Sequence, residues 1–306
     1  MSIIFAFLDG VGLATAGSDN PLTHAPMPTM RALLHGPLTS EQTQRRADLL
    51  LAPIDATLGL PGLPQSGTGQ TALFAGFNAA AMHGRHQPAF PPVALRRRLV
   101  EQSVLRRVVD GGGTATFANP FAPSYWEAVA ARRVRRSASV IATEGAGLRF
   151  RNEDDLRAGR AVAWDITGAA MRGRGSETPL VAPFAAGNHL ARLAYDHDLV
   201  LWESFLPDLA GHGRLPFGVA DAMERVDAML AGLLATKRPE DTLVISSDHG
   251  NVESVGAPAH TRNPVLLLVV GPGAAAFANA KDITDVAGGI MRVLAMPDQQ
   301  PRVANR

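Results

Sequence analysis

The sequence has no cysteine, no excess of charge of either sign and no apolar run long enough to cross a membrane. Without cysteine, disulfides, iron–sulfur clusters, thiolate zinc sites and cysteine nucleophiles are excluded, so a metal site would have to use Asp, Glu, His or hydroxyl oxygen. Lys and Arg number 29 against 28 for Asp and Glu, and this balance gives no general attraction to nucleic acid or anionic membranes. The longest apolar run, PVLLLVV, has only the length of a strand. We therefore expect neither a nucleic-acid partner nor a membrane partner.

The composition is that of a soluble globular protein. The 306 residues are 46% hydrophobic and 19% charged, which is enough apolar material for a sizeable buried core. The stretch MSIIFAFLDGVG has no basic leader, and its short apolar run is interrupted by Asp9 and Gly10. This pattern predicts a first strand rather than a signal peptide, and we expect a cytoplasmic protein.

Apolar strand patterns alternate with amphipathic helix patterns along most of the chain. Strands are predicted at 3–9, 48–60, 114–120, 199–208, 241–250 and 264–273. Helices are predicted at 27–36, from about 68 onward, and at 91–113, 187–198, 217–236 and 282–296. Continuous apolar strands separated by helices indicate a three-layer α/β/α core around a mostly parallel sheet.

Residues 121–184 have a different composition, rich in Arg, Gly and charge, with short weak strand patterns such as SVIAT and AVAWDIT. We interpret this segment as a small inserted cap. The core would then consist of residues 1–120 and 185–306.

Three of the predicted strands end in acidic residues. Asp9 follows IIFAFL, Asp208 follows LVLWESFLP, and the pair Asp248 and His249 follows TLVISS. Ligands of open α/β sheets bind outside the carboxyl ends of the strands, so these carboxylates would converge. They would repel one another, and because few basic residues lie nearby, a divalent cation is the simplest way to neutralise them.

Two further segments add candidate groups. In PDLAGHG, Asp208 and His212 are four residues apart, which places both side chains on one face if a helical turn follows the strand. In QSGTGQTALFAG, hydroxyl groups lie at a Gly-rich turn that leads into a helix, a place that favours phosphate. Ser66 or Thr68 could equally be a simple helix cap there.

The motifs LDGVG, the Gly-rich hydroxyl turn, DLAGH, SSDHGN and HTRNPV occur in this chain order. In that order they resemble the metal-ligand motifs of the alkaline phosphatase superfamily, and most of all those of cofactor-independent phosphoglycerate mutase and phosphopentomutase. The resemblance implies an alkaline phosphatase-like fold and two divalent metal ions, Mn or Zn. It assigns one ion to Asp9, Thr68, Asp248 and His249, and the other to Asp208, His212 and His260.

The resemblance also implies a hydroxyl nucleophile. Thr68 fits best because its spacing to Gly76 suits the nucleophile helix of the family, with Thr71 and Ser66 as alternatives. The mutases carry a large substrate-binding domain between the nucleophile and the DxxGH motif, whereas only 139 residues, 69 to 207, separate Thr68 from Asp208 here. Part of those 139 residues belongs to the core.

We therefore expect a two-metal phosphoryl-transfer enzyme, a phosphatase or phosphodiesterase that hydrolyses a small phosphorylated substrate. A phosphomutase with a reduced cap and a catalytically silent metal-binding scaffold are the alternatives. The arginines of the insertion, which would suit an anionic substrate or a solvated basic face, are assigned no individual roles: Arg132, Arg133, Arg135, Arg136, Arg151 and Arg172.

Overall fold

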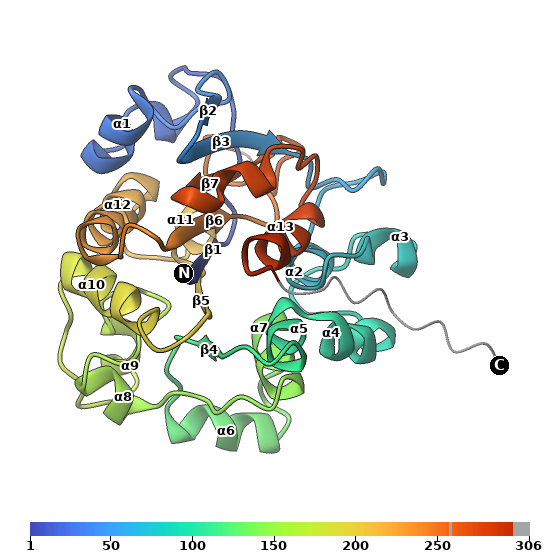
Figure 1. Cartoon of the computed structure of the whole chain (residues 1–306), viewed down its shortest axis with the longest axis vertical. Coiled ribbons are helices and arrows are strands. Elements are labelled where there is room, and N and C mark those ends of the chain that lie inside the picture. The colour runs from blue at the N-terminus through green and yellow to red at the C-terminus, as the bar shows by residue number, and fades with distance from the viewer. Residues whose placement is uncertain (257–258, 296–306) are drawn as a thin grey trace.

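The centre of the computed structural model, which describes residues 1–256 and 259–295, is a sheet of seven strands in the order β2-β3-β7-β6-β1-β5-β4 (Figure 1). The strands of this described part are β1 (Ile3–Leu8), β2 (Gln44–Arg46), β3 (Leu49–Ile54), β4 (Ala115–Phe117), β5 (Leu199–Ser204), β6 (Thr242–Ser246) and β7 (Val265–Val270). The neighbours β4, β5, β1 and β6 run parallel to one another. β7 is antiparallel to β6, β3 to β7, and β2 to β3. The mostly parallel sheet predicted from the sequence is confirmed.

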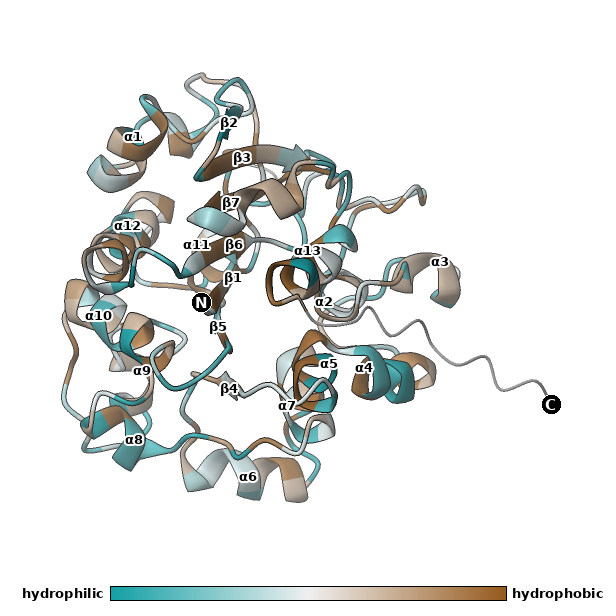
Figure 2. Ribbon diagram, viewed as in Figure 1, coloured by the Kyte–Doolittle hydropathy of each residue, from teal (hydrophilic) through white to brown (hydrophobic). Residues whose placement is uncertain are grey.

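Helices cover both faces of the sheet. One face packs against α2 (Ser66–Ala75), α4 (Arg96–Gln102), α5 (Val104–Asp110), α7 (Ala138–Gly145) and α13 (Asp285–Val293). The other face packs against α1 (Pro28–Leu34), α10 (Pro183–Leu193) and α12 (Val219–Thr236). Figure 2 shows β3 in the brown of hydrophobic residues, whereas the edge strand β2, with the sequence QRR, is teal. Every residue of β1 and β5 is buried, as expected for parallel strands covered on both sides.

The remaining helical elements are short and lie at the ends of strands or in the connections. They are α3 (Ala79–His83), α6 (Pro123–Ala130), α8 (Glu153–Arg157), α9 (Ala169–Arg172), α11 (Leu206–Gly211) and the 3-10 turns η1 (Pro21–Thr23), η2 (Val93–Leu95) and η3 (Pro272–Phe277). No helix in the described ranges is long and apolar enough to span a membrane.

Three of the sequence predictions differ from the structure. The single helix expected at 91–113 is interrupted at Ser103, which leaves the helical conformation and accepts a hydrogen bond from the Arg106 N–H, so that it caps α5. The strand expected in SVIAT belongs to α7, because the Ser137 hydroxyl caps this helix and Ile141 is buried against the core. The described residues form no strand in AVAWDIT, although most of that segment is buried. The last residue of the helix predicted at 282–296 lies outside the described residues.

The predicted cap, residues 121–184, is therefore not uniform. Its helices α6, α8 and α9 lie at one edge of the molecule, beyond β4 (Figure 1). α7, in contrast, packs against α2, α4 and α5 of the core.

Candidate metal centre

The predicted ligands lie together at the carboxyl ends of three adjacent parallel strands. Asp9 directly follows β1, Asp208 lies in α11 just after β5, and Asp248 and His249 follow β6. Because β1 pairs with both β5 and β6, these ends share one edge of the sheet. The fold thus brings together residues that are up to 240 positions apart.

The first group of ligands is formed by Asp9, Asp248 and His249, all of them buried. His249 Nε2 lies 3.1 Å from Asp9 Oδ1 and 3.6 Å from Asp248 Oδ2. The Ser66 hydroxyl lies 3.0 Å from the same His249 nitrogen. One imidazole nitrogen, two carboxylates and a hydroxyl therefore point into one small volume.

The second group is formed by Asp208, His212 and His260. The short helix α11 places Asp208 and His212 one turn apart, with 3.4 Å between Asp208 Oδ1 and His212 Nε2. His260 Nε2 lies 3.3 Å from His212 Nε2 and 3.8 Å from Asp208 Oδ1. His260 Nδ1 is 2.8 Å from the Pro64 carbonyl oxygen, so it carries the proton and leaves Nε2 free as a ligand.

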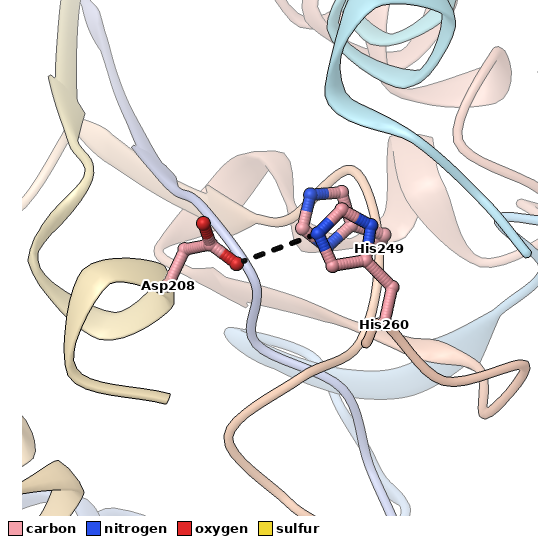
Figure 3. A group of neighbouring side chains, drawn as sticks. All are labelled: Asp208, His249 and His260. Carbon is pink, nitrogen blue, oxygen red and sulfur yellow. Dashed lines mark ion pairs between the residues drawn. The ribbon is translucent and has the colours of Figure 1, made fainter. Parts of the chain in front are cut away.

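These separations suit ligands that surround a single ion. Arms of 2.0–2.1 Å in a tetrahedron place neighbouring ligand atoms about 3.3 Å apart. The two groups are also contiguous, because His249 stacks on His260 with ring centroids 3.6 Å apart. Figure 3 shows His249 beside His260 and Asp208, which together form a further set of ligand atoms within 4.8 Å of one another. His249 therefore stands at the border between the two groups.

The buried carboxylates favour a cation. Burial raises the pKa of Asp9 well above its ordinary value, and the charge of Asp208 raises it further. Burial raises the pKa of Asp248 in the same way, followed by the charge of Asp9. Asp9 Oδ1, both Asp248 carboxylate oxygens and His249 Nδ1 are buried without a hydrogen-bond partner in the described part of the chain. A divalent cation would offset this repulsion and desolvation, so the residues fit a metal site.

Residues outside the predicted set hold the ligands in place. The Gln70 side chain donates a hydrogen bond of 3.3 Å to Asp9, and the Asn251 amide donates one of 2.7 Å to Asp208 Oδ1. Buried Glu253 accepts hydrogen bonds from the Gly12 and Asn251 N–H groups and from the Asn263 side chain. It thereby joins the loops that follow β1 and β6 to the segment that precedes β7.

Two glycines allow the close approach of these segments. Gly10 has a φ of +75°, and a Cβ there would lie 2.8 Å from Asp208 Oδ1. A Cβ at Gly69 would lie 2.8 Å from the Asp248 carbonyl oxygen, so only glycine lets α2 pack this closely against the loop after β6.

The three candidate hydroxyls of α2 point in different directions. The Thr68 hydroxyl contacts the Gln65 carbonyl and accepts a hydrogen bond of 3.1 Å from the Gln87 N–H, so it faces away from the ligands. The Thr71 hydroxyl donates to the Gly67 carbonyl inside the helix. Ser66 is the hydroxyl beside His249, and the geometry therefore favours this alternative over the Thr68 prediction.

A cavity of about 1130 Å³ opens from the metal centre toward α6 and residues 164–177. Asp9, Ser66, Asp208, His212 and His260 line one end of it. We call it the catalytic cavity.

Glu203, which the sequence prediction missed, also lines the catalytic cavity. Burial raises its pKa to about 8, and one of its carboxylate oxygens has no hydrogen-bond partner among the described residues. An acidic residue inside the apolar strand LVLWES was the available signal, because a buried acid is rare without a partner.

The arginines of residues 121–184 have different surroundings. Arg135 lines the catalytic cavity, with its guanidinium 5.7 Å from the centre of the Phe90 ring. Arg136 forms an ion pair of 3.5 Å with Glu144. Arg151 is buried and donates to Thr116 Oγ1 and the Arg160 carbonyl, with Arg149 and Arg192 around a separate hollow of about 430 Å³. Arg132 and Arg133 are exposed, and Arg172, also exposed, lies outside both hollows.

The sheet order, the covering helices and the ligands at the strand ends define an alkaline phosphatase-like metalloenzyme fold. The cold-active alkaline phosphatase of a psychrophilic Shewanella species superposes with a TM-score of 0.56 over 96% of this chain and 100% of that chain, at 15% identity. Residues 187–298 match the model of the Metalloenzyme superfamily. That segment carries Asp208, His212, Asp248, His249 and His260.

Curated relatives agree with this assignment. The phosphopentomutase of Chromohalobacter salexigens is 43% identical over 67 residues, which are 22% of this chain and 16% of that protein. The 2,3-bisphosphoglycerate-independent phosphoglycerate mutase of Cereibacter sphaeroides is 30% identical over 128 residues, 39% of this chain and 25% of that protein. The resemblance inferred from the motifs is confirmed, and the matches span a quarter or less of these relatives.

Proposed function

We propose that this protein is a metal-dependent phosphoester hydrolase that uses Ser66 as its nucleophile. The observation that carries this proposal is the position of the Ser66 hydroxyl, 3.0 Å from His249 Nε2 and in the wall of the catalytic cavity. A nucleophile of phosphoryl transfer must lie beside the groups that neutralise the phosphoryl oxygens, and Ser66 meets this requirement.

Two divalent cations, zinc or manganese, would be held by the two ligand groups. Asp9, Asp248, His249 and Ser66 would hold one, and Asp208, His212 and His260 the other. When bound, such ions stabilise negative charge on the attacking, leaving and phosphoryl oxygens. Nitrogen and carboxylate ligands are compatible with both metals.

The residues of the chain then have distinct tasks. Ser66 Oγ gives up its proton to solvent and forms the bond to phosphorus. The oxygen of the leaving group departs with the electron pair of the bond that breaks and takes up a proton from water. Ser66 is the first residue of α2, so the helix N-terminus favours the negative charge of the phosphoryl group. A water molecule then hydrolyses the phosphoserine and releases phosphate. The cavity leads from this point to the surface, where the alcohol leaves.

A phosphomutase is the second candidate, because the curated relatives are mutases. It differs from a hydrolase in returning the phosphoryl group to another position of the same substrate. The substrate in either case would be a small phosphorylated compound, and the cytoplasmic location stays a prediction from the sequence.

Hydrolysis of an aryl phosphate monoester and an aryl phosphate diester by protein loaded with Mn²⁺ or Zn²⁺ tests the proposal. We expect Ser66→Ala to lose at least about 10³-fold in kcat, as for other enzymes deprived of their nucleophile. Thr68→Val, which removes a hydroxyl two residues further along the same helix, is the matched control and should keep its turnover.

The opposite pattern, with loss only in Thr68→Val, would return the nucleophile to Thr68. Absence of hydrolysis by the metal-loaded protein, together with isomerisation of a sugar phosphate, would establish the mutase. Absence of both reactions would indicate a silent metal-binding scaffold.

A further inference from the structure

The catalytic cavity is much larger than a phosphoryl group needs. Its volume of about 1130 Å³ lies just above the range of about 300–1,000 Å³ that is typical of pockets enclosing whole organic ligands. The metal centre occupies one end, so most of the cavity is available to the leaving group of the substrate.

Aromatic side chains from the β4–α6 connection and from α6 itself form one wall. Phe121 and Tyr125 both line the cavity, with ring centroids 4.7 Å apart. Behind them, Phe121 packs against Trp126 at 5.4 Å and edge-on against Phe150 at 5.5 Å. Burial raises the pKa of Tyr125 to about 12, so the phenol stays neutral. The wall is therefore a supported, uncharged aromatic surface.

A second aromatic pair lines the same cavity. Trp164 and Phe205 lie with ring centroids 6.1 Å apart. Phe205 immediately precedes α11, three residues before the ligand Asp208. This second pair therefore lies close to the metal centre. Phe90 is the fifth aromatic residue of the lining.

Charge in the lining away from the metal centre is mixed, with an excess of arginine. Glu153 and Glu177 are opposed by four arginines: Arg135, Arg157, Arg174 and Arg214. Arg157 is engaged with Asp154 at 2.6 Å, and Arg135 lies over the Phe90 ring. The excess favours entry of an anionic substrate.

We infer that the substrate is a phosphoester whose leaving group carries a planar aromatic ring of nucleobase size, held by the aromatic lining of the catalytic cavity. The inference rests on the proposed function for the chemistry at Ser66. A sugar or glycerate leaving group without an aromatic ring could not stack on the five partly exposed rings of the cavity lining. A planar ring can stack on them, and such stacking contributes a substantial part of the binding of bases to proteins.

A matched pair of substrates isolates the contribution of the ring. Adenosine 5′-monophosphate and ribose 5-phosphate both carry the phosphate on C5 of ribose, so the leaving oxygen is the same and only the base differs. We expect kcat/KM to be about 10- to 100-fold higher for the nucleotide, the range that stacking energies per base imply.

Variants of the aromatic wall sharpen the test. Phe121→Leu and Tyr125→Leu should move the ratio toward one, because they should lower kcat/KM for the nucleotide much more than for ribose 5-phosphate. Phe184→Leu is the matched control, because Phe184 is an exposed aromatic residue of α10 outside the cavity lining. A second pair, naphthyl phosphate and phenyl phosphate, distinguishes a requirement for a nucleobase from a requirement for any large arene.

The outcomes separate this inference from the proposed function. Hydrolysis of both members of the first pair at equal kcat/KM, or a ratio unchanged in Phe121→Leu and Tyr125→Leu, would overturn the inference and leave the hydrolase standing. If no substrate is turned over, calorimetric binding of adenosine 5′-monophosphate against ribose 5-phosphate to the metal-loaded protein gives the same comparison. Equal affinities there would overturn it as well.

Discussion

The metal centre takes its side chains from loops that follow three adjacent strands, whereas the aromatic lining of the same cavity comes largely from residues 121–164. In the metal centre, polar contacts hold three of the candidate ligands: Gln70 contacts Asp9, Asn251 contacts Asp208, and the Pro64 carbonyl contacts His260. In the lining, the rings of Phe121 and Tyr125 are positioned by other rings. Polar contacts of defined geometry suit a reaction that tolerates little displacement, while ring packing suits recognition of shape. A change in the first region should therefore affect every substrate, and a change in the second only some.

The largest effect is expected from His212→Ala. Loss of one of three ligands should reduce the bound metal from two equivalents to one, measured by elemental analysis after dialysis. Turnover of every phosphoester should fall about 10³-fold, because metal ions contribute several kcal/mol to such reactions. His197→Ala is the control, since His197 lines the separate hollow and its Nδ1 lies 2.9 Å from the Leu193 carbonyl oxygen. If His212→Ala still bound two equivalents of metal, His212 would not be a metal ligand.

A smaller effect is expected from Asn251→Ala. The Asn251 amide donates to the Asp208 carboxylate and backbone, so its loss leaves a ligand unsupported. We expect metal affinity to fall about 10- to 100-fold, as for other residues that orient metal ligands, and the stoichiometry to stay at two. Competition with a chromogenic chelator measures both quantities. An unchanged affinity would show that α11 alone positions Asp208.

The smallest effect is expected at the edge of the inserted segment, from Asp155→Asn. Arg149 donates to both carboxylate oxygens of buried Asp155 at 2.7 Å, which lowers the pKa of Asp155 from its ordinary value of 3.8 to about 2. We expect a loss of about 2–4 °C in Tm at pH 7, with metal binding unchanged. The Tm values of wild type and variant are measured by thermal unfolding after treatment with a chelator.

The sign of the pH dependence follows from the depressed pKa. The unfolded chain takes up the proton of Asp155 near its ordinary pKa, while the folded protein resists protonation until about pH 2. The stabilisation is therefore complete above about pH 5 and is lost as the pH falls toward 2. The difference in Tm between wild type and Asp155→Asn should narrow between pH 7 and pH 3. A constant difference in Tm would show that the stabilisation does not depend on the charge of Asp155.

The sequence was sufficient to predict that the candidate ligands whose placement depends on local position lie together. Asp9, Asp208 and Asp248 were predicted because parallel strands end at one edge, and His212 because four residues make one helical turn. Ser66 and Thr68 were not separable in this way. They lie about 200° apart around the helix axis, so only the packing of α2 against the loop after β6 decides which one faces the ligands.

Supporting residues were beyond the reach of the sequence for a related reason. Glu253 lies only four residues after His249, but its role depends on N–H groups of Gly12 and on Asn263, which come from other segments. Glu203 sits in a correctly predicted strand, yet its exposure to the catalytic cavity depends on where β4 and α6 lie. The aromatic lining has no motif, since its rings are spread over residues 90 to 205.

The position of β1 in the sheet has a consequence for the order of assembly during translation. Ile3 pairs with Leu199 on one side and with Thr242 on the other, so β1 has no neighbouring strand until about two hundred further residues have been synthesised. The six apolar residues of β1 therefore have no strand to pair with on the nascent chain until then, and Asp9, which follows them, has no other candidate ligand beside it. Contacts between residues so far apart in the sequence slow folding, and until they form they leave an aggregation-prone apolar segment exposed. The centre that would bind metal is thus among the last parts of this protein to form, and a growing chain cannot capture its ions early.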